Sequence, residues 1–545
     1  MACPQYPVGL PNILARCQAS PFEGLYLTLS SLHRCATALA LAATLVPGSR
    51  ALAQGTAEVA GTNHALTARL TAWYEATSHR APGQWGIAVA DQTGRMLWSV
   101  NPGQPLVPAS TVKLFTTGFA RSVLGGAARR PTRVVGVGGL DPATGTWKGS
   151  WALELNGDPT LERAQGSGPS LYDLALQLAS AGVRKLNGPL EVQSAEGPAT
   201  AVYPAAWSSR HRGRLFAPPV GALTLHENIV WITVRPGAKV GHKARLVETA
   251  PQGMTSLVTV TATTNAGRRS RLRLGRRKDG GWIVSGTIGA RASSRRLTAV
   301  ASDPKVVLNA VWGSALAKAG IAWNRAPSAS PPPEGEPQIL AEVASAPLDS
   351  LASEINRRSL NLGAELLLQW AGGRVGAHER LTQHVREVIG SSDGVYLADG
   401  SGLSYEDRVT PSAFIAYLAK FPGTAAGQNF PQLLPANGTG TLRRLNTGFP
   451  GEGVVRAKTG TLQQVSTVVG YLGTSEGVLL VSLMYNGTRP WAARQAQWKL
   501  FRELGADGVV IPTDSVPAPP VQMGGDADST GAASAGAAAG IVVTD

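Results

Sequence analysis

Residues 107–114 read Val-Pro-Ala-Ser-Thr-Val-Lys-Leu, so Ser110 and Lys113 are spaced as Ser-x-x-Lys. If this run begins a helix, the two side chains share a face, because residues three apart are neighbours on a helix. A serine hydroxyl is a weak nucleophile at neutral pH and needs a base beside it. A lysine whose pKa is lowered by burial can be that base. The spacing therefore favours a serine acyl-transfer enzyme that uses no catalytic histidine.

Two further motifs follow along the chain. Ser359 and Asn361 form Ser-x-Asn in a region of helical pattern, and Lys458, Thr459 and Gly460 form Lys-Thr-Gly ahead of a strand-like run. Each motif alone is explained equally well as a helix start, a polar helix face or a turn. Together with Ser-x-x-Lys, and in this order, they form the signature of penicillin-binding proteins and class A β-lactamases.

The similarity extends beyond the three motifs. Over nearly all of residues 60–510 the chain resembles the low-molecular-mass class C penicillin-binding proteins, which are D-alanyl-D-alanine carboxypeptidase/endopeptidases. The segments that carry the resemblance are Gly157–Leu161, Ala222–Leu223 with Asn228, Ile355–Asn361 with Ala364–Glu365, Asp399–Ser404 with Thr410–Pro411, and Gly438–Leu442. The chain departs from the family at Leu360, where Asp is common, and at residues 405–407.

Ser110 and Ser359 are 249 positions apart, a gap that also resembles this family, whereas ordinary serine β-lactamases lack so long an insert. The resemblance implies an α/β (α+β) fold: a serine β-lactamase/transpeptidase-like catalytic domain interrupted by a β-rich nested two-domain insert. We expect the catalytic domain at 54–128 and 341–512, an inserted domain II at 129–158 and 235–340, and a nested domain III at 159–234.

Roles for the nucleophile and its bases follow from the resemblance. Ser110 attacks the carbonyl between two D-alanines and forms an acyl-enzyme, while Lys113 accepts its proton. Ser359 relays that proton toward the leaving amine, and Lys458 keeps the site electropositive. Water then releases the acyl group.

The remaining site residues bind the substrate in this scheme. Asn361 hydrogen-bonds both Lys113 and a substrate amide. Thr459 and Thr461, flanking Gly460, bind the terminal carboxylate. The backbone N–H groups of Ser110 and Thr461 form the oxyanion hole, where the loss of one donor typically costs about 2.7–4 kcal/mol. No metal or cofactor is expected.

The chain is strongly basic, with a formal net charge of +15 over 545 residues. Residues 54–512 alone carry +17, which predicts attraction to anionic polymers. Residues 268–278 are especially rich in arginine. Their alternating pattern fits either a solvated edge strand or a patch that binds an acidic polymer. An anionic membrane surface or the cell wall is the expected peripheral partner, and nucleic acid is not.

Both ends of the chain differ from the middle. An apolar run at 35–46 and Ala51-Leu52-Ala53 predict an export signal over residues 1–53, and hence a periplasmic or other extracytoplasmic location. A short anchor or a buried helix is the alternative interpretation of the same run. Residues 513–545 are rich in Ala, Gly and Asp, which predicts a disordered tail.

Three rival functions remain open at this point. A β-lactamase or esterase on the same scaffold would hydrolyse penicillin rapidly. A peptidoglycan-binding protein with an inactive site would not be labelled at Ser110. A nucleic-acid binder is disfavoured by the export signal. The substrates expected from the resemblance are peptidoglycan stem peptides, with β-lactams as inhibitors, and the oligomeric state stays undetermined.

Overall fold

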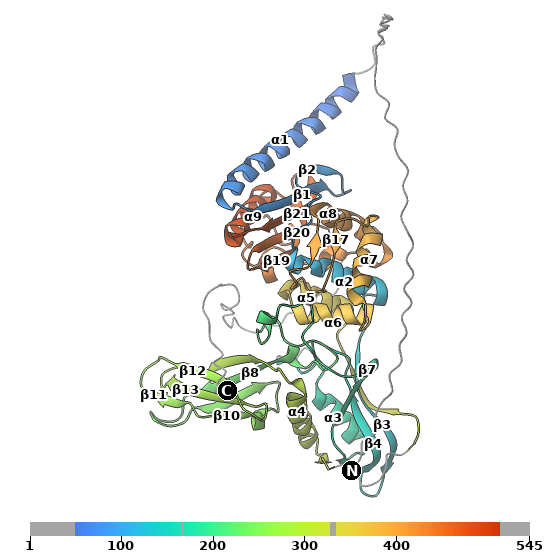
Figure 1. Cartoon of the computed structure of the whole chain (residues 1–545), viewed down its shortest axis with the longest axis vertical. Helices are drawn as coiled ribbons and strands as arrows, with labels where there is room; N and C mark the ends of the chain where they lie inside the picture. Colours follow the sequence, from blue (N-terminus) through green and yellow to red (C-terminus); the bar gives the residue numbers. More distant parts are fainter. Residues whose placement is uncertain (1–49, 165–167, 327–333, 513–545) are drawn as a thin grey trace, which may run out of the picture. The chain divides into compact units, whose positions relative to one another are not determined.

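The computed structural model describes residues 50–164, 168–326 and 334–512, with side chains described from residue 64 onward (Figure 1). Most of the predicted signal region 1–53 and all of the predicted tail 513–545 lie outside these residues. Within the described part of the chain, no helix is long and apolar enough to cross a membrane.

A five-stranded antiparallel sheet organises the part of the chain that carries the three motifs. Its strands lie in the order β19 (Val455–Leu462), β20 (Val465–Thr474), β21 (Gly477–Asn486), β1 (Gln84–Asp91) and β2 (Met96–Val100). A strand from the first part of the described chain and a strand from its last part therefore lie side by side, because β1 pairs with β21. β19 is an edge strand, so its backbone is available on one side.

Alternate residues of these strands face two different cores. Val89 packs in the core that includes α9 (Pro490–Gly505), whereas its neighbours Ala88 and Ala90 belong to the core on the opposite face. This is the two-residue period of a strand whose two faces are both covered. α1 (Arg50–Arg80) joins the α9 side through Leu70. The opposite face is covered by α2 (Lys113–Leu124), α5 (Leu348–Arg358), α6 (Asn361–Gly372), α7 (Ala377–Ile389) and α8 (Pro411–Lys420).

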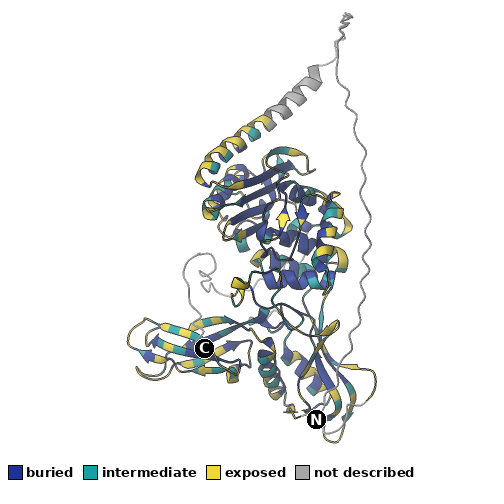
Figure 2. Cartoon of the chain, viewed as in Figure 1, coloured by how far each residue is buried: buried dark blue, intermediate teal, exposed yellow. Residues whose placement is uncertain are grey.

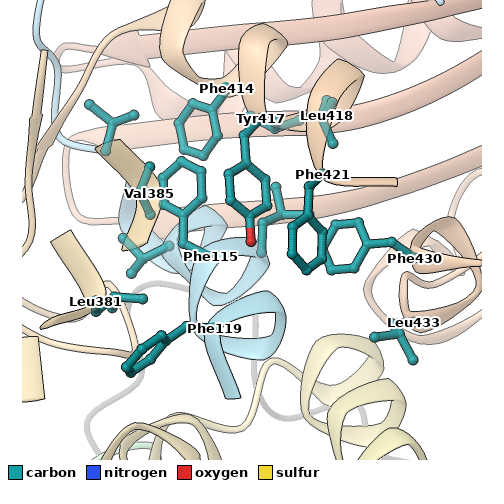
Figure 3. Packing of buried hydrophobic residues seen from close by; sticks show 14 of the residues in the cluster. Phe115, Phe119, Leu381, Val385, Phe414, Tyr417, Leu418, Phe421, Phe430 and Leu433 are labelled. Atoms are coloured by element: carbon teal, nitrogen blue, oxygen red, sulfur yellow. The ribbon is translucent and has the colours of Figure 1, made fainter. Parts of the chain in front are cut away.

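Aromatic rings fix α2 in this second core. The ring of Phe115 stacks on Phe414 with centroids 4.8 Å apart and meets Tyr417 edge-on at 4.9 Å (Figure 3). Phe115 is fully buried, and burying such a side chain contributes about 1.5–3 kcal/mol. Because Phe115 lies two residues after Lys113, this packing holds the start of α2 in place.

Between α2 and α5 the chain forms three further sheets and two long helices. A seven-stranded sheet contains β3 (Pro131–Asp141), β4 (Thr146–Glu154), β5 (Lys185–Asn187), β6 (Glu191–Ser194), β7 (Gly197–Pro198), β15 (Ala322–Asn324) and β16 (Gln338–Ala344). A four-stranded sheet contains β10 (Val258–Val260), β11 (Thr263–Asn265), β12 (Arg271–Arg276) and β13 (Trp282–Gly289). A three-stranded sheet contains β8 (Ile229–Arg235), β9 (Arg245–Ala250) and β14 (Arg295–Val300). The helices are α3 (Leu171–Ser180) and α4 (Pro304–Lys318).

The sheets divide this insert differently from the expected boundaries. Residues 159–234, expected to be a nested domain III, supply β5, β6 and β7 to the same sheet as β3 and β4. Residues 229–300 instead form two sheets of their own, and the chain then returns to the first sheet through β15. We therefore propose 229–300 as the nested segment, in place of 159–234. The short strands of this region carry no signal of their partners, so the sequence alone does not group them into sheets.

Candidate active site

Ser110 and Lys113 lie where a 3-10 turn passes into α2. The turn η1 spans Ala109–Val112, and Lys113 is the first residue of α2. Lys113 Nζ donates to Ser110 Oγ at 3.0 Å. The sequence predicted a helix at both residues; Ser110 lies in the tighter turn instead, where residues three apart also share a face. The expected nucleophile and the expected base are thus in direct contact.

Lys113 is fully buried, and this burial changes its acidity. Its Nζ also donates to Asn361 Oδ1 at 2.6 Å and to the backbone oxygen of Ser401 at 2.5 Å. Burial lowers the pKa of Lys113 to about 8, and the carboxyl groups of Asp399 and Glu365 oppose that shift. An amine with this pKa releases and accepts a proton near neutral pH, as a general base must.

Three acidic side chains lie buried behind Lys113. Burial and the Asp399 carboxyl raise the pKa of Glu365 to about 8, and the same causes raise the pKa of Asp407 well above its usual range. Asp399 accepts the backbone N–H groups of residues 401–404 at 2.6–3.2 Å and Trp207 Nε1 at 3.0 Å. This carboxylate therefore shapes the loop whose oxygen holds Lys113, and it ties that loop to the insert.

The second motif occupies the break between α5 and α6. Ser359 ends α5 in the left-handed conformation, with φ 57° and ψ 43°, and Asn361 begins α6. The sequence indicated a continuous helical region, whereas the structure places the motif at the junction of two helices. The left-handed turn is uncommon for a residue other than glycine or asparagine, and strain of this kind gathers at functional sites.

Asn361 connects the first motif to the insert. Its Oδ1 accepts from Lys113, while its Nδ2 donates to the backbone oxygen of Phe216 at 2.9 Å. Glu365 lies one turn further along the same face of α6 and accepts the Gly400 N–H at 3.1 Å. The predicted contact of Asn361 with Lys113 is present, and the amide group expected to meet substrate contacts the insert.

Lys458 is the second buried lysine and lies on the edge strand β19. Its Nζ donates to Ser359 Oγ at 2.9 Å and to the backbone oxygen of Thr459 at 2.8 Å. Burial, together with the positive charges of Lys113 and Arg494, lowers the pKa of Lys458 well below its usual value. The structure thus joins all three motifs: a lysine–serine pair at the junction of η1 and α2 lies near a second lysine–serine pair that bridges β19 and the end of α5.

Gly460 lets β19 approach the nucleophile closely. A Cβ added there would lie 2.6 Å from the backbone oxygen of Pro108, which itself accepts from Thr467 Oγ1 at 2.7 Å. Real Cβ atoms do not come so near an oxygen, so a larger residue would push the strand away from the turn that carries Ser110. The third motif therefore needs a glycine at this position.

The backbone of β19 alternates between two sides. The N–H of Ala457 donates to the Pro435 oxygen at 3.2 Å, on the side away from β20. N–H groups alternate along a strand, so those of Thr459 and Thr461 point to the same free side. The Ser110 N–H lies in the first turn of η1, where amides have no partner within the helix. The N–H groups of Ser110 and Thr461, the expected oxyanion-hole donors, thus have no hydrogen-bond partner within their own helix turn or strand pair.

Arg494 of α9 is a site residue that the sequence analysis missed. It is buried, and its Nη2 donates to the backbone oxygens of Gly460 at 2.7 Å and Thr467 at 2.8 Å. Burial lowers its pKa to about 9. The arginine holds β19 against β20 and adds positive charge behind Lys458. No motif marks it, and its burial is visible only in the assembled fold.

The comparisons with known proteins agree with this geometry. Residues 75–503 match the D-Ala-D-Ala carboxypeptidase 3 (S13) family. A D-alanyl-D-alanine carboxypeptidase of Actinomadura sp. (strain R39) is 28% identical over 431 residues, covering 74% of this chain and 77% of the relative. A carboxypeptidase of Mycobacterium tuberculosis is 27% identical over 424 residues, covering 73% of this chain and 75% of the relative.

The fold is similar to that of a solved structure. The crystal structure of penicillin binding protein 4 of Haemophilus influenzae superposes with a TM-score of 0.61 at 21% identity, covering 79% of this chain and 98% of that chain. The predicted fold class is confirmed by this likeness, and the predicted resemblance to class C penicillin-binding proteins is confirmed by the family match. Since that match includes all three motifs, this chain is a serine peptidase that belongs to the D-Ala-D-Ala carboxypeptidase 3 (S13) family.

Proposed function

We propose that Ser110 is the nucleophile of a D-Ala-D-Ala carboxypeptidase that also cleaves peptidoglycan cross-links as a DD-endopeptidase. One observation carries this proposal: Lys113 Nζ, whose pKa is lowered to about 8, lies 3.0 Å from Ser110 Oγ. A serine beside a buried amine is the arrangement that activates a hydroxyl without histidine.

Acylation proceeds in this scheme as follows. Lys113 takes the Ser110 proton while Oγ bonds to the carbonyl carbon of the penultimate D-alanine. The N–H groups of Ser110 and Thr461 hold the oxygen that becomes negative. The C–N bond then breaks, and the leaving amine takes a proton from Ser359, which lies 2.9 Å from Lys458 Nζ. The proton that Lys113 took from Ser110 replaces it on Ser359, so Lys113 returns to its neutral form. Water releases the acyl group and regenerates Ser110.

The end of the substrate binds along β19. Arg494 donates to the backbone oxygen of Gly460 and places positive charge behind this strand, which suits the carboxylate of a terminal D-alanine. Thr459 and Thr461 also lie on β19, and in this proposal their hydroxyl groups bind the carboxylate. In an endopeptidase substrate, the leaving amine belongs to a neighbouring stem peptide.

A variant of the nucleophile tests the function. Wild type, Ser110→Ala and, as a matched control, Ser294→Ala at an exposed serine of the insert are incubated with labelled penicillin and with purified muropeptides. We expect covalent labelling and product formation in wild type and control, and neither in Ser110→Ala. Mass analysis separates D-alanine loss from monomers and conversion of dimers to monomers. Rapid hydrolysis of penicillin would contradict the proposal and indicate a β-lactamase.

We also propose that the protein is exported and works outside the cytoplasm, in contact with the cell wall. Support comes from the signal-like sequence of residues 1–53 and from the family substrate. Fractionation of cells, with determination of the mature N-terminus, tests this; a cytoplasmic protein that keeps residues 1–53 would contradict it.

A further inference from the structure

The nested segment 229–300 has an unusually large net positive charge for its length. Its 72 residues contain 14 Lys or Arg and only two acidic residues, Glu248 and Asp279, so the segment carries +12. The whole chain carries +15. Every residue of this segment is described by the structure.

Very little of this charge is neutralised within the protein. Asp279 pairs with Arg277, and Glu248 lies 3.5 Å from Arg296, whose guanidinium also stacks over Trp231 at 4.4 Å. Each of the two acidic residues therefore already has an arginine partner. The other twelve cations of the segment have no carboxylate within 4 Å among the described residues. A protein surface with so many unpaired cations attracts a polyanion.

The strand register gathers a subset of these cations on one face of the four-stranded sheet. Thr263 of β11 pairs with Thr287 of β13, which pairs with Arg271 of β12, and Lys243 bridges to Thr263 on the other side. Paired residues on neighbouring strands share a face of the sheet. The two threonine hydroxyls therefore lie in one row between a lysine and an arginine.

A second row runs beside the first. Arg273 pairs with Ser285, two residues along each strand from the Arg271–Thr287 pair, which places the rows about 6.6–6.8 Å apart. The alternate residues Leu272 and Leu274 pack against the core. Figure 2 shows the chain coloured by burial, with exposed and less exposed residues along the strands of the insert. We name this surface the basic face, and it consists of Lys243, Thr263, Arg271, Arg273, Ser285 and Thr287. None of these six is acidic, and the three cations are exposed.

The side chains around the basic face indicate the kind of anion. Membrane-surface binding uses exposed aromatic and apolar anchors, and single-stranded nucleic acid binds by stacking on aromatic rings. In 229–300, Trp282 is buried and Trp231 lies under Arg296. The exposed large apolar side chains of the segment are Val240 and Val247, and neither belongs to the basic face. Arginine forks flanked by hydroxyls fit carboxylates and phosphates, which they hold by paired hydrogen bonds. The chemistry favours a polyanion, and the proposed peptidoglycan substrate is one that displays carboxylates.

We propose that the basic face binds the peptidoglycan polymer through the free carboxylates of its stem peptides, at a site on a different sheet from the one that carries Lys458. This inference rests on the proposed function, because that function makes peptidoglycan the substrate. Each ionic contact is weak and screened by salt, and several contacts to a repeating polymer add up. The insert thereby keeps the enzyme on its polymeric substrate between catalytic events.

Two matched triple variants test this site. One removes the cations of the basic face, Lys243→Gln, Arg271→Gln and Arg273→Gln. The control removes three exposed cations of the same segment outside that face, Arg235→Gln, Lys239→Gln and Arg245→Gln. Each triple variant loses three positive charges. Binding is measured by co-sedimentation with peptidoglycan sacculi stripped of phosphate-linked polymers by hydrofluoric acid, and with phosphatidylglycerol vesicles, at low and high salt.

We expect the basic-face variant to lose about tenfold in affinity for stripped sacculi and the control less than about threefold. Equal losses, no loss, or tighter binding to vesicles or unstripped sacculi than to stripped sacculi would overturn the proposal. Thermal unfolding shows whether each variant is folded. Penicillin labelling of Ser110, measured on wild type and control, tests the proposed function separately. If neither protein is labelled but the two variants still differ in sedimentation, the proposed function is overturned and the binding site is retained.

Discussion

Lys113 and Lys458 are fully buried between helices and sheet, whereas Lys243, Arg271 and Arg273 are exposed on the basic face of the insert. The buried pair contacts only defined acceptors and has lowered pKa values. The exposed cations stand beside hydroxyls and face water. Burial makes a cation reactive, because it can lose its proton, whereas exposure keeps a cation charged and available for reversible binding. In the proposed scheme, one chain uses the same residue types for chemistry and for attachment.

The largest effect is expected at Lys113. Replacing it by alanine removes the group that takes the Ser110 proton, so we expect the acylation rate with penicillin to fall by about a thousandfold or more. Lys499→Ala, at an exposed lysine of α9 that pairs with Glu503, is the matched control and should acylate like wild type. A Lys113→Ala protein that acylates within tenfold of wild type would show that another group is the base.

Ser359→Ala should have the next largest effect. The change removes the hydroxyl 2.9 Å from Lys458 Nζ and with it the proposed path of the proton to the leaving amine. We expect turnover of a D-Ala-D-Ala peptide to fall by about a hundredfold, the lower end of general acid–base effects. Steady-state kinetics should place the loss in kcat. A change confined to KM would instead assign Ser359 to substrate binding.

The sequence identified the residues expected to react, but it did not identify the buried residues that surround them. The motifs containing Ser110, Ser359 and Lys458 were recognisable because their spacing and order are specific. Glu365 lay in a recognised segment, yet nothing in the sequence showed that it would be buried near Lys113. Arg494 has no motif at all. Burial is a property of the assembled fold, so residues that act by changing a pKa are harder to find than residues that react.

The same limit explains what was missed in the fold. The strand-like run after Lys458 was recognisable because it is long and apolar, and it forms β20. In the insert, β10, β11 and β5 are three residues long and their partners lie far away in sequence. The Arg-rich run fitted either a solvated edge strand or a polymer-binding patch, and the structure shows an alternating edge strand at Arg271–Arg276. Grouping strands into sheets needs tertiary contacts that alternation does not encode.

Glu365→Gln should change the pH dependence of acylation more than its maximum rate. The Glu365 carboxylate raises the pKa of Lys113, so its removal lowers that pKa. Acylation needs the neutral amine and should rise with pH through about 8 in wild type. In Glu365→Gln the rising limb should move to lower pH by up to about one unit. The glutamine side chain in Glu365→Gln can still accept a hydrogen bond from the Gly400 N–H. An unchanged limb, measured by penicillin acylation from pH 5 to 10, would contradict this electrostatic role.

The smallest effect is expected for the stability of the basic-face triple variant. Exposed charges contribute about 0–1 kcal/mol each even when they are paired, and these three have no ion-pair partner among the described residues. Removing them relieves mutual repulsion, so the free energy of unfolding should stay within about 1 kcal/mol of wild type or rise slightly. Denaturant unfolding at low salt measures this, with Lys113→Ala for comparison, where a buried group is lost. A large destabilisation of the triple variant would mean that these cations support the fold of the insert, and the division between buried reactive charge and exposed binding charge would then fail.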